Sequence, residues 1–209
     1  MPYSKRTTIF VVDDTEAACQ SLTDLFASAG WKCLAYADGQ SLLEAVDPKV
    51  PDCLILSQQT PSMDGLAVLE SLRSRRLNLP VIILTACGDV TSAVRAMKLG
   101  AADYLERPCP EHVLLDAVRS ALDHDRTRRN RRAQIAAAVE KLARLTPRER
   151  QVVNLLADGR LTKQIAAELK ISPKTVEVHR ANIMRKTQAN NIAELVRMVV
   201  YEQVSEDCW

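Results

Sequence analysis

Residues 162–180 read TKQIAAELKISPKTVEVHR, a pattern of two short helices joined by a tight turn. Ser172 and Pro173 stand in the order typical of a helix N-cap and first turn, so the second helix is expected to begin there. Small Ala166 permits close contact between the two helices. The other apolar positions recur at helical spacing and form a wedge: Ile165, Leu169, Ile171, Val176 and Ile183. The segment therefore predicts a helix-turn-helix with its turn at Lys170–Ser172.

The second helix carries an outward face of polar and small side chains, which is typical of a helix that reads bases in the major groove of DNA. This face consists of Lys174, Thr175, Glu177, Val178, Ala181 and Arg185. A rim of cations and hydroxyl groups around it is expected to meet phosphates. The rim consists of Thr162, Lys163, Ser172, Arg180 and Lys186. A plain helical bundle is the alternative, but it does not explain why turn, wedge and basic rim coincide.

Further helices are expected on both sides of this motif. Thr146 is placed as an N-cap before Pro147 and Glu149, which predicts a capping box at the start of the preceding helix, Pro147–Ala157. A last helix is expected over Asn191–Glu202. The whole C-terminal part is therefore predicted to be helical.

Residues 145–202 closely resemble the DNA-binding domain of the LuxR/NarL/FixJ regulators, through the stretches LTPRERQV and TVEVHR. The resemblance implies that the helix Pro173–Lys186 reads the groove and that the last helix contributes to dimerisation. Relatives often have a glycine near residues 187–189, where this sequence has none. The resemblance therefore leaves the geometry of that turn open.

The first half of the sequence alternates β-branched runs with amphipathic segments. Apolar strands alternating with helices indicate a parallel sheet covered on both faces. The expected strands are Thr8–Val12, Asp52–Leu56 and Val81–Leu84, with weaker candidates at Lys32–Tyr36 and Ala102–Leu105. The expected helices are Glu16–Ser28, Gln40–Val46, Gly65–Arg75, Asp89–Leu99 and a segment from Pro110 onward. The predicted fold class is α/β, a doubly wound five-stranded parallel domain joined by a helical linker to an all-α helix-turn-helix domain.

Two carboxylates follow the first expected strand. Asp13 and Asp14 thus lie at the carboxyl end of a parallel sheet, where α/β folds place their sites, and a carboxylate pair suits a hard cation such as Mg²⁺. Residues 7–122 resemble the receiver domain of response regulators, which implies the strand order 2-1-3-4-5. Thr85 and Tyr104 also match positions of the receiver's phosphorylation site.

At two site positions the sequence departs from the receiver pattern. Ser57 stands where the family has its phosphoacceptor aspartate, and Arg107 stands where it has a lysine. A serine hydroxyl is a poor nucleophile without a general base, and the loss of one carboxylate weakens Mg²⁺ binding. Arg107 keeps the positive charge and is able to pair with Asp13 or Asp14, so that it mimics an occupied site. We expect a receiver that needs no cofactor and is not switched by aspartyl phosphorylation; the alternative is that Ser57 is itself phosphorylated.

Protein contact or redox chemistry is expected to replace the phosphate signal. The resemblance implies dimerisation through Asp89–Leu99 and Tyr104–Cys109, so a homodimer is expected, with a sensor kinase or another regulatory protein as a further partner. Cys87 and Cys109 follow adjacent strands and are redox candidates, unless both are small buried hydrophobes. A pseudo-receiver that sequesters a partner is a further alternative, against which the intact basic rim argues.

Charge and composition restrict the remaining classes. Residues 1–125 carry 11 Lys and Arg against 17 Asp and Glu, a net −6, whereas residues 126–209 carry 17 against 9, a net +8. Only the back half is therefore expected to meet a polyanion, double-stranded promoter DNA. No apolar run suits a membrane span, no Cys and His spacing suits zinc, and Asp13 and Asp14 lack the nucleophile or base of an enzyme. We expect a cytoplasmic transcription regulator that is not an enzyme.

The sequence divides into three expected segments. These are a receiver-like domain at residues 1–122, a helical linker at 123–144 and the DNA-binding domain at 145–209. After Pro110 no helix breaker occurs before Pro147, but Asp123–Arg132 is strongly polar. We therefore expect two helical pieces with this stretch as a bendable middle.

Overall fold

The computed structural model of the chain describes residues 7–46 and 53–206. The chain divides into two compact units between Thr127 and Arg128, and each unit is described by itself. Three features of the sequence lie outside the described residues: residues 1–6 of the first expected domain, Asp52 of the expected third strand, and Cys208. In the part of the chain that is described, no helix combines the length and the apolar composition of a membrane span.

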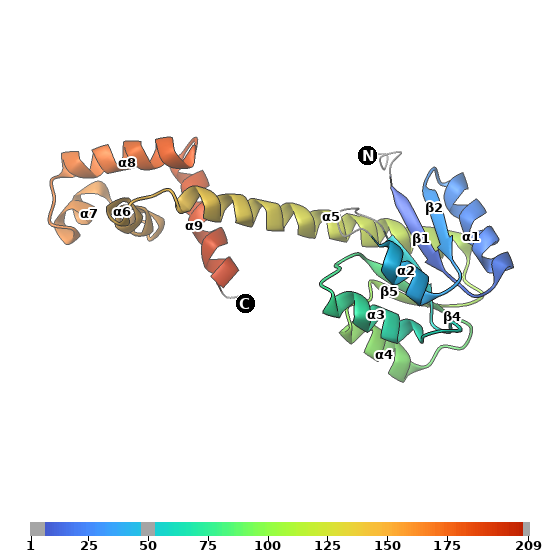
Figure 1. Cartoon of the computed structure of the whole chain (residues 1–209). Helices are drawn as coiled ribbons and strands as arrows, with labels where there is room; N and C mark the ends of the chain where they lie inside the picture. Colours follow the sequence, from blue (N-terminus) through green and yellow to red (C-terminus); the bar gives the residue numbers. More distant parts are fainter. Residues whose placement is uncertain (1–6, 47–52, 207–209) are drawn as a thin grey trace. The chain divides into compact units, whose positions relative to one another are not determined.

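The first unit contains a five-stranded parallel sheet in the order β2-β1-β3-β4-β5, as the receiver resemblance implied (Figure 1). The central strands are buried on both faces because each is apolar almost throughout. The strands are β1 Thr8–Val12, β2 Lys32–Tyr36, β3 Cys53–Ser57, β4 Val81–Thr85 and β5 Asp103–Glu106.

Helices cover both faces of the sheet, as the alternating pattern predicted. One face packs against Phe26 of α1 and Leu114 of α5, and the other packs against Leu42 of α2, Leu69 of α3 and Ala96 of α4 (Figure 1). The first four helices are α1 Glu16–Ser28, α2 Gly39–Ala45, α3 Gly65–Ser74 and α4 Val90–Lys98. Two hydrophobic cores therefore hold the sheet in place and leave its carboxyl edge for the site.

The prediction that the long helix is divided into two pieces is wrong. Helix α5 runs without interruption over Glu111–Leu142 and includes all of Asp123–Arg132. Its charged middle contains arginine, which is among the better helix formers, and no glycine or proline, so polarity alone does not end the helix. Its first turns bury Leu114 and Val118 in the first unit, and its last turns bury Ala138 and Leu142 in the second.

The second unit confirms the helix-turn-helix pattern. Four of the six wedge residues are buried, with Ile165, Val176 and Ile183 fully covered and Ala166 at 4% exposure. The other two, Leu169 and Ile171, are partly buried and pack against this core. The helices are α6 Pro147–Ala157, α7 Thr162–Glu168, α8 Pro173–Thr187 and α9 Ile192–Glu206. Apolar spacing therefore located both helices of the motif and the turn between them.

The turn after α8 shows how the chain manages without the glycine of its relatives. Gln188 adopts the left-handed conformation, with φ 56° and ψ 29°, as the C-cap of α8. A side chain there costs about 1–2 kcal/mol relative to an ordinary helical residue. The turn geometry is thus kept by a strained glutamine.

A buried charged group ties the start of α6 to the end of α8. Glu149 accepts hydrogen bonds from the Thr146 backbone N–H at 2.8 Å and from Lys186 Nζ at 2.7 Å. The side chains of Glu149 and Lys186 are 5% and 29% exposed. Burial raises the pKa of Glu149, but its bonds to Lys186 and Thr146 outweigh burial and hold the pKa below its usual range. The predicted capping box is present, and its glutamate also anchors the C-terminal end of α8 through Lys186.

Replacing Gln188 with glycine should raise the free energy of unfolding by about 0.5–1 kcal/mol, because glycine takes the left-handed conformation without steric cost. The matched control is Gly159→Ala, where φ is 78° and no atom lies within 4 Å of the added Cβ, so any loss is conformational. That control should lose about 1 kcal/mol. Denaturant unfolding of both variants checks the pair, and a loss of stability in Gln188→Gly equal to that of the control would refute the strain.

Replacing Lys186 with methionine should cost about 2 kcal/mol of unfolding free energy, because Glu149 then stays buried without its counter-charge. Since the folded-state pKa of Glu149 is depressed, its contribution is present above the unfolded pKa of about 4.3 and is lost as pH falls through the folded value. Glu149→Gln should abolish that pH dependence. Denaturant unfolding between acid and neutral pH measures both effects, with exposed Lys163→Met as control. Unchanged stability of Lys186→Met at neutral pH contradicts this role.

Candidate functional site

The strand register brings the predicted phosphorylation-site residues to one edge of the sheet. Val12 pairs with Leu56 and Ser57 pairs with Leu84, so Asp13, Ser57 and Thr85 stand at the carboxyl ends of three adjacent strands. All three side chains belong to buried residues. The next strand contributes Arg107, whose backbone N–H donates to the Thr85 carbonyl at 2.7 Å.

An ion pair occupies the centre of this site. Arg107 Nη2 lies 2.6 Å from Asp13 Oδ2, and the Asp13 side chain is 1% exposed. The other oxygen, Asp13 Oδ1, accepts a hydrogen bond from the Thr15 backbone N–H at 3.0 Å. Asp14 is exposed, and among the described residues its side chain accepts from the Thr15 hydroxyl alone. The expected pairing of Arg107 with an aspartate is confirmed, and the partner is Asp13.

The residues at this edge do not fit a magnesium ion. Both carboxylate oxygens of Asp13 already accept hydrogen bonds, one of them from a cation. Ser57 supplies no charge where a third carboxylate would stand, and within residues 7–46 and 53–206 no group of three His, Cys, Asp or Glu is placed to hold a metal. A divalent cation would have to displace the guanidinium of Arg107 and would then find only two carboxylates.

Gln58 is a site residue that the sequence reasoning missed. The Tyr104 hydroxyl donates to Gln58 Oε1 at 2.6 Å, which ties the aromatic ring to the loop after Ser57. Gly65 permits that loop to close, because a Cβ there would meet the Ser57 carbonyl at 2.5 Å. The pair lies far apart in the sequence, so only the fold reveals it.

The last residue of β4, Thr85, holds the turn that follows the strand. Thr85 Oγ1 donates to the Cys87 carbonyl at 3.0 Å and accepts from the Cys87 N–H at 3.3 Å.

Cys87 is exposed and Cys109 is partly buried, so the alternative that both are buried hydrophobes is wrong for Cys87. Both are free thiols, and their redox role stays a prediction.

The second unit presents the predicted base-reading face to solvent. Ser172 Oγ accepts from the Thr175 N–H at 3.0 Å and so caps α8, as expected. Val178 is 56% exposed, so this face also presents an apolar side chain that is able to contact a base. All members of the face are exposed: Lys174, Thr175, Glu177, Val178, Ala181 and Arg185.

The rim around this face differs from the expectation in part. Lys163 is exposed on α7. Arg180 Nη1 donates to Thr162 Oγ1 at 3.0 Å, so these two rim residues bridge α8 to α7. Lys186 does not stand free for phosphate, because its ammonium is engaged by buried Glu149. Sequence spacing placed Lys186 on the correct helix but gave no sign of the acid on α6 that holds it.

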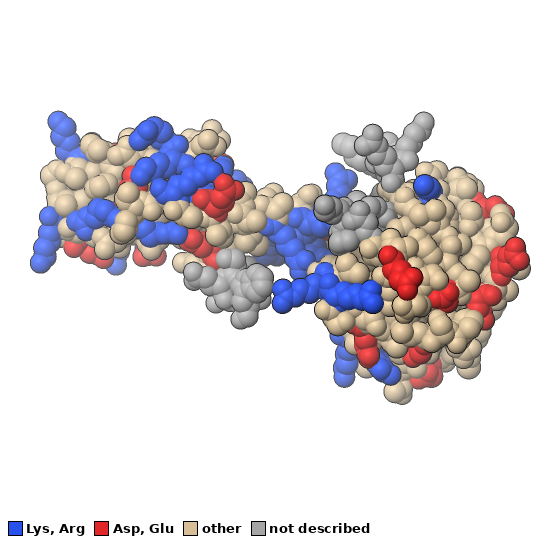
Figure 2. All heavy atoms as spheres, in the orientation of Figure 1, with Lys and Arg blue, Asp and Glu red and all other residues tan. Residues whose placement is uncertain are grey.

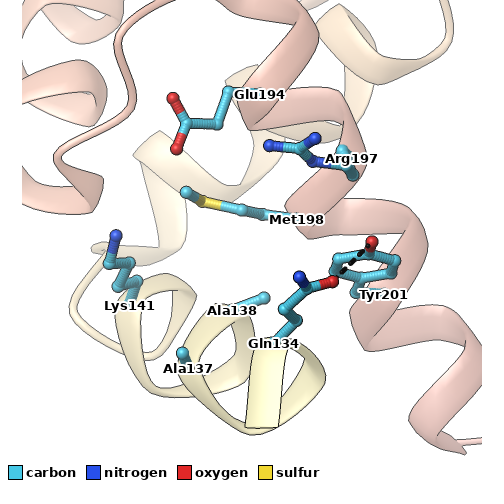
Figure 3. Close-up of a pocket in the computed structure, with 8 residues that line it drawn as sticks. All are labelled: Gln134, Ala137, Ala138, Lys141, Glu194, Arg197, Met198 and Tyr201. Carbon is cyan, nitrogen blue, oxygen red and sulfur yellow. Dashed lines mark hydrogen bonds between the residues drawn. The ribbon is translucent and has the colours of Figure 1, made fainter. Parts of the chain in front are cut away.

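A hollow of about 210 Å³ lies between the end of α5 and α9, within the second unit (Figure 3). Tyr201 Oη donates to Gln134 Oε1 at 3.1 Å at one side of it. The lining residues are Gln134, Ala137, Ala138, Lys141, Glu194, Arg197, Met198 and Tyr201. Charges of both signs surround an apolar floor, so the hollow has no preference for a ligand of one sign.

Two protein families match this chain in the same order as its two units. Residues 9–119 match the family described as "Response regulator receiver domain". Residues 143–199 match "Bacterial regulatory proteins, luxR family". The two matches leave residues 120–142 between them, which form the C-terminal part of α5.

Curated relatives and solved structures resemble nearly the whole chain. Nodulation protein W of Bradyrhizobium diazoefficiens is 37% identical over 195 residues, which cover 93% of this chain and 86% of that protein. Transcriptional regulatory protein FixJ of the same species is 38% identical over 192 residues, 92% and 94% of the two chains. The structure of the response regulator StyR superimposes with a TM-score of 0.80 at 38% identity, covering 93% and 98%. Full-length FixJ from B. japonicum gives 0.60 at 38% identity, covering 94% and 97%. The chain therefore belongs to the response-regulator family of transcription factors, with a receiver domain followed by a LuxR-type DNA-binding domain.

Proposed function

We propose that this response regulator controls transcription without being switched by aspartyl phosphorylation. One observation carries the proposal: the Arg107 guanidinium lies 2.6 Å from Asp13, at the sheet edge where Ser57 replaces an acid. The cation required by phosphoryl transfer and the nucleophile that receives the phosphoryl group are thereby both lost.

Chemistry at Ser57 supports this reading. Its hydroxyl belongs to a residue that is 8% exposed, and the three histidines of the chain all lie beyond the sheet, at positions 112, 124 and 179. A hydroxyl without a neighbouring base remains protonated and attacks phosphorus slowly. A fixed positive charge beside Asp13 instead holds the site in one electrostatic state.

The output of the proposed regulator is binding to double-stranded promoter DNA as a homodimer. The exposed face of α8 supplies the base contacts, and one short helix offers too few of them for a single copy. The face of α4 exposes Val90 at 80%, Val94 at 46% and Met97 at 51%, an apolar stripe at helical spacing. We place the dimer contact on this stripe and expect the regulator in the cytoplasm, where the chromosome is.

Signals other than aspartyl phosphorylation are able to control the same DNA binding. A sensor kinase or another regulatory protein would act through contact with the receiver rather than through a phosphoryl group. Exposed Cys87 keeps a redox input as a second candidate, because a thiol must reach solvent to be oxidised. We propose no catalytic activity, and the relatives FixJ and StyR are named as regulators.

Phosphoramidate with Mg²⁺ should leave the mass of the wild-type chain unchanged. The double variant Ser57→Asp/Arg107→Lys restores the acid and removes the guanidinium, so it should gain one phosphoryl group. Intact-mass spectrometry at neutral pH measures the number of phosphoryl groups on the wild type and on the double variant. Ser57→Ala is the matched control for phosphate on other residues. Stoichiometric acyl-phosphate on the wild type and equally on Ser57→Ala would overturn the proposal, whereas phosphate on the wild type that is absent from Ser57→Ala would establish the alternative, a phosphoserine.

Removing the two cations of the α8 face should weaken DNA binding. The double variant Lys174→Gln/Arg185→Gln should lower affinity by at least ten-fold, because each lost contact to a base edge is worth about 1–3 kcal/mol. Fluorescence anisotropy on a duplex selected by the wild type from a random pool measures it. Lys32→Gln/Arg76→Gln removes two exposed charges from the receiver and should bind like the wild type. Equal affinities of the two double variants would contradict the assignment of α8.

A further inference from the structure

The middle of α5 carries a basic segment, residues 126–132, with the sequence RTRRNRR. It holds five arginines in seven residues, and the next acidic residue along the chain is Glu140. Arg126, Arg131 and Arg132 are exposed. In Figure 2 this part of α5, which is yellow in Figure 1, is covered by Lys and Arg side chains. The segment is thus a concentrated patch of positive charge outside the helix-turn-helix.

Helix stability does not explain this segment. Arg128 stands three residues before Arg131 and four before Arg132, so like charges occupy neighbouring positions on the helix surface. Such pairs destabilise a helix by about 0.2–0.5 kcal/mol each. Within the described ranges no ion pair joins Arg131 or Arg132 to an acid. The clustered arginines therefore lower the local stability of α5.

The composition of the segment indicates a polyanion rather than a protein surface as its partner. From Arg126 to Gln134 the only apolar residue is Ala133. Protein interfaces are built around an apolar or aromatic centre, and this stretch offers none. Arginine side chains, in contrast, pair with phosphate oxygens through two parallel hydrogen bonds, and duplex DNA presents one phosphate charge per about 1.7 Å.

The segment is fixed to the unit that reads DNA. Ala138 and Leu142 of the same helix are buried in the hydrophobic core that also contains Val176 and Ile183 of α8. Arg131 and Arg132 precede Ala138 by seven and six residues, which is about 10 Å along a helix. Arg131 and Arg132 therefore belong to the same packed unit as α8. When α8 binds a duplex, these two arginines lie a short distance along α5 from the core that supports α8.

We propose that Arg131 and Arg132 of the basic segment bind phosphates of the DNA that flanks the bases read by α8. This inference rests on the proposed DNA binding and adds to it a second, sequence-independent contact. The contact raises affinity for the region around an operator without changing which bases are preferred. It also makes binding depend on duplex length beyond the recognised bases.

The test measures how the affinity of the full-length protein falls with salt on two duplexes, one limited to the selected bases and one with long flanks. On the long duplex, the slope of log affinity against log salt should be steeper for the wild type than for Arg131→Gln/Arg132→Gln. The expected difference is about 3.6 for the bound homodimer, because two arginines are lost from each of two protomers and each phosphate contact contributes about 0.9. On the short duplex the two proteins should give equal slopes. Glutamine is chosen because it maintains the helix.

Two matched variants make the result specific. Arg131→Lys/Arg132→Lys keeps both charges and should keep most of the wild-type slope, whereas Lys32→Gln/Arg76→Gln loses two charges elsewhere and should keep all of it. Circular dichroism checks that each variant is folded. If Arg131→Gln/Arg132→Gln unfolds, the wild type alone still tests the inference. Its log affinity must fall more steeply with log salt on the long duplex than on the short one.

Several outcomes would overturn the inference. One such outcome is that the wild type gives the same slope of log affinity against log salt on both duplexes. Another is that the folded Arg131→Gln/Arg132→Gln variant gives the wild-type slope on the long duplex. Dissociation of the dimer in sedimentation, with the slope retained, would assign the segment to an acidic protein surface instead. Failure of the wild type to bind any duplex would refute the proposed function itself, which is a distinct result.

Discussion

The Arg107–Asp13 ion pair is the constraint on which this receiver depends. Asp13 is buried at the end of a central strand, and a buried carboxylate is costly unless a cation and hydrogen bonds compensate it. In this chain the Arg107 guanidinium and the Thr15 backbone N–H compensate the carboxylate. Under the proposed function, this contact is permanent and Ser57 offers no acid for a phosphoryl group.

Each of the two units has its own hydrophobic core and its own buried ion pair. The sheet needs only its two hydrophobic cores and a compensated Asp13, and both are satisfied within the first unit. The second unit has its own core and its own buried pair, Glu149 with Lys186. Under the proposed function, a signal acts on the contact that the receiver makes with other proteins, and the exposed stripe on α4 is where we place that contact.

Local chemistry made much of this structure predictable from the sequence. Apolar runs located the strands, and the capping box at Thr146 and Glu149 located the start of α6. Contacts between distant segments were not predictable, because periodicity says nothing about partners. Gln58 with Tyr104 is one example, and the capture of Lys186 by Glu149 is another. The continuity of α5 was missed because polarity was taken as a break, although only glycine or proline would have supplied one.

Magnesium titration of the receiver edge tests the central claim most directly. Isothermal calorimetry compares Mg²⁺ binding to the wild type and to the double variant with Ser57→Asp and Arg107→Lys, at neutral pH and in the absence of phosphodonor. The account predicts no saturable binding to the wild type and clear binding to the variant, in which three carboxylates face an open position. Saturable binding of Mg²⁺ to the wild type with the affinity of the variant would contradict the claim that Arg107 takes the place of the cation.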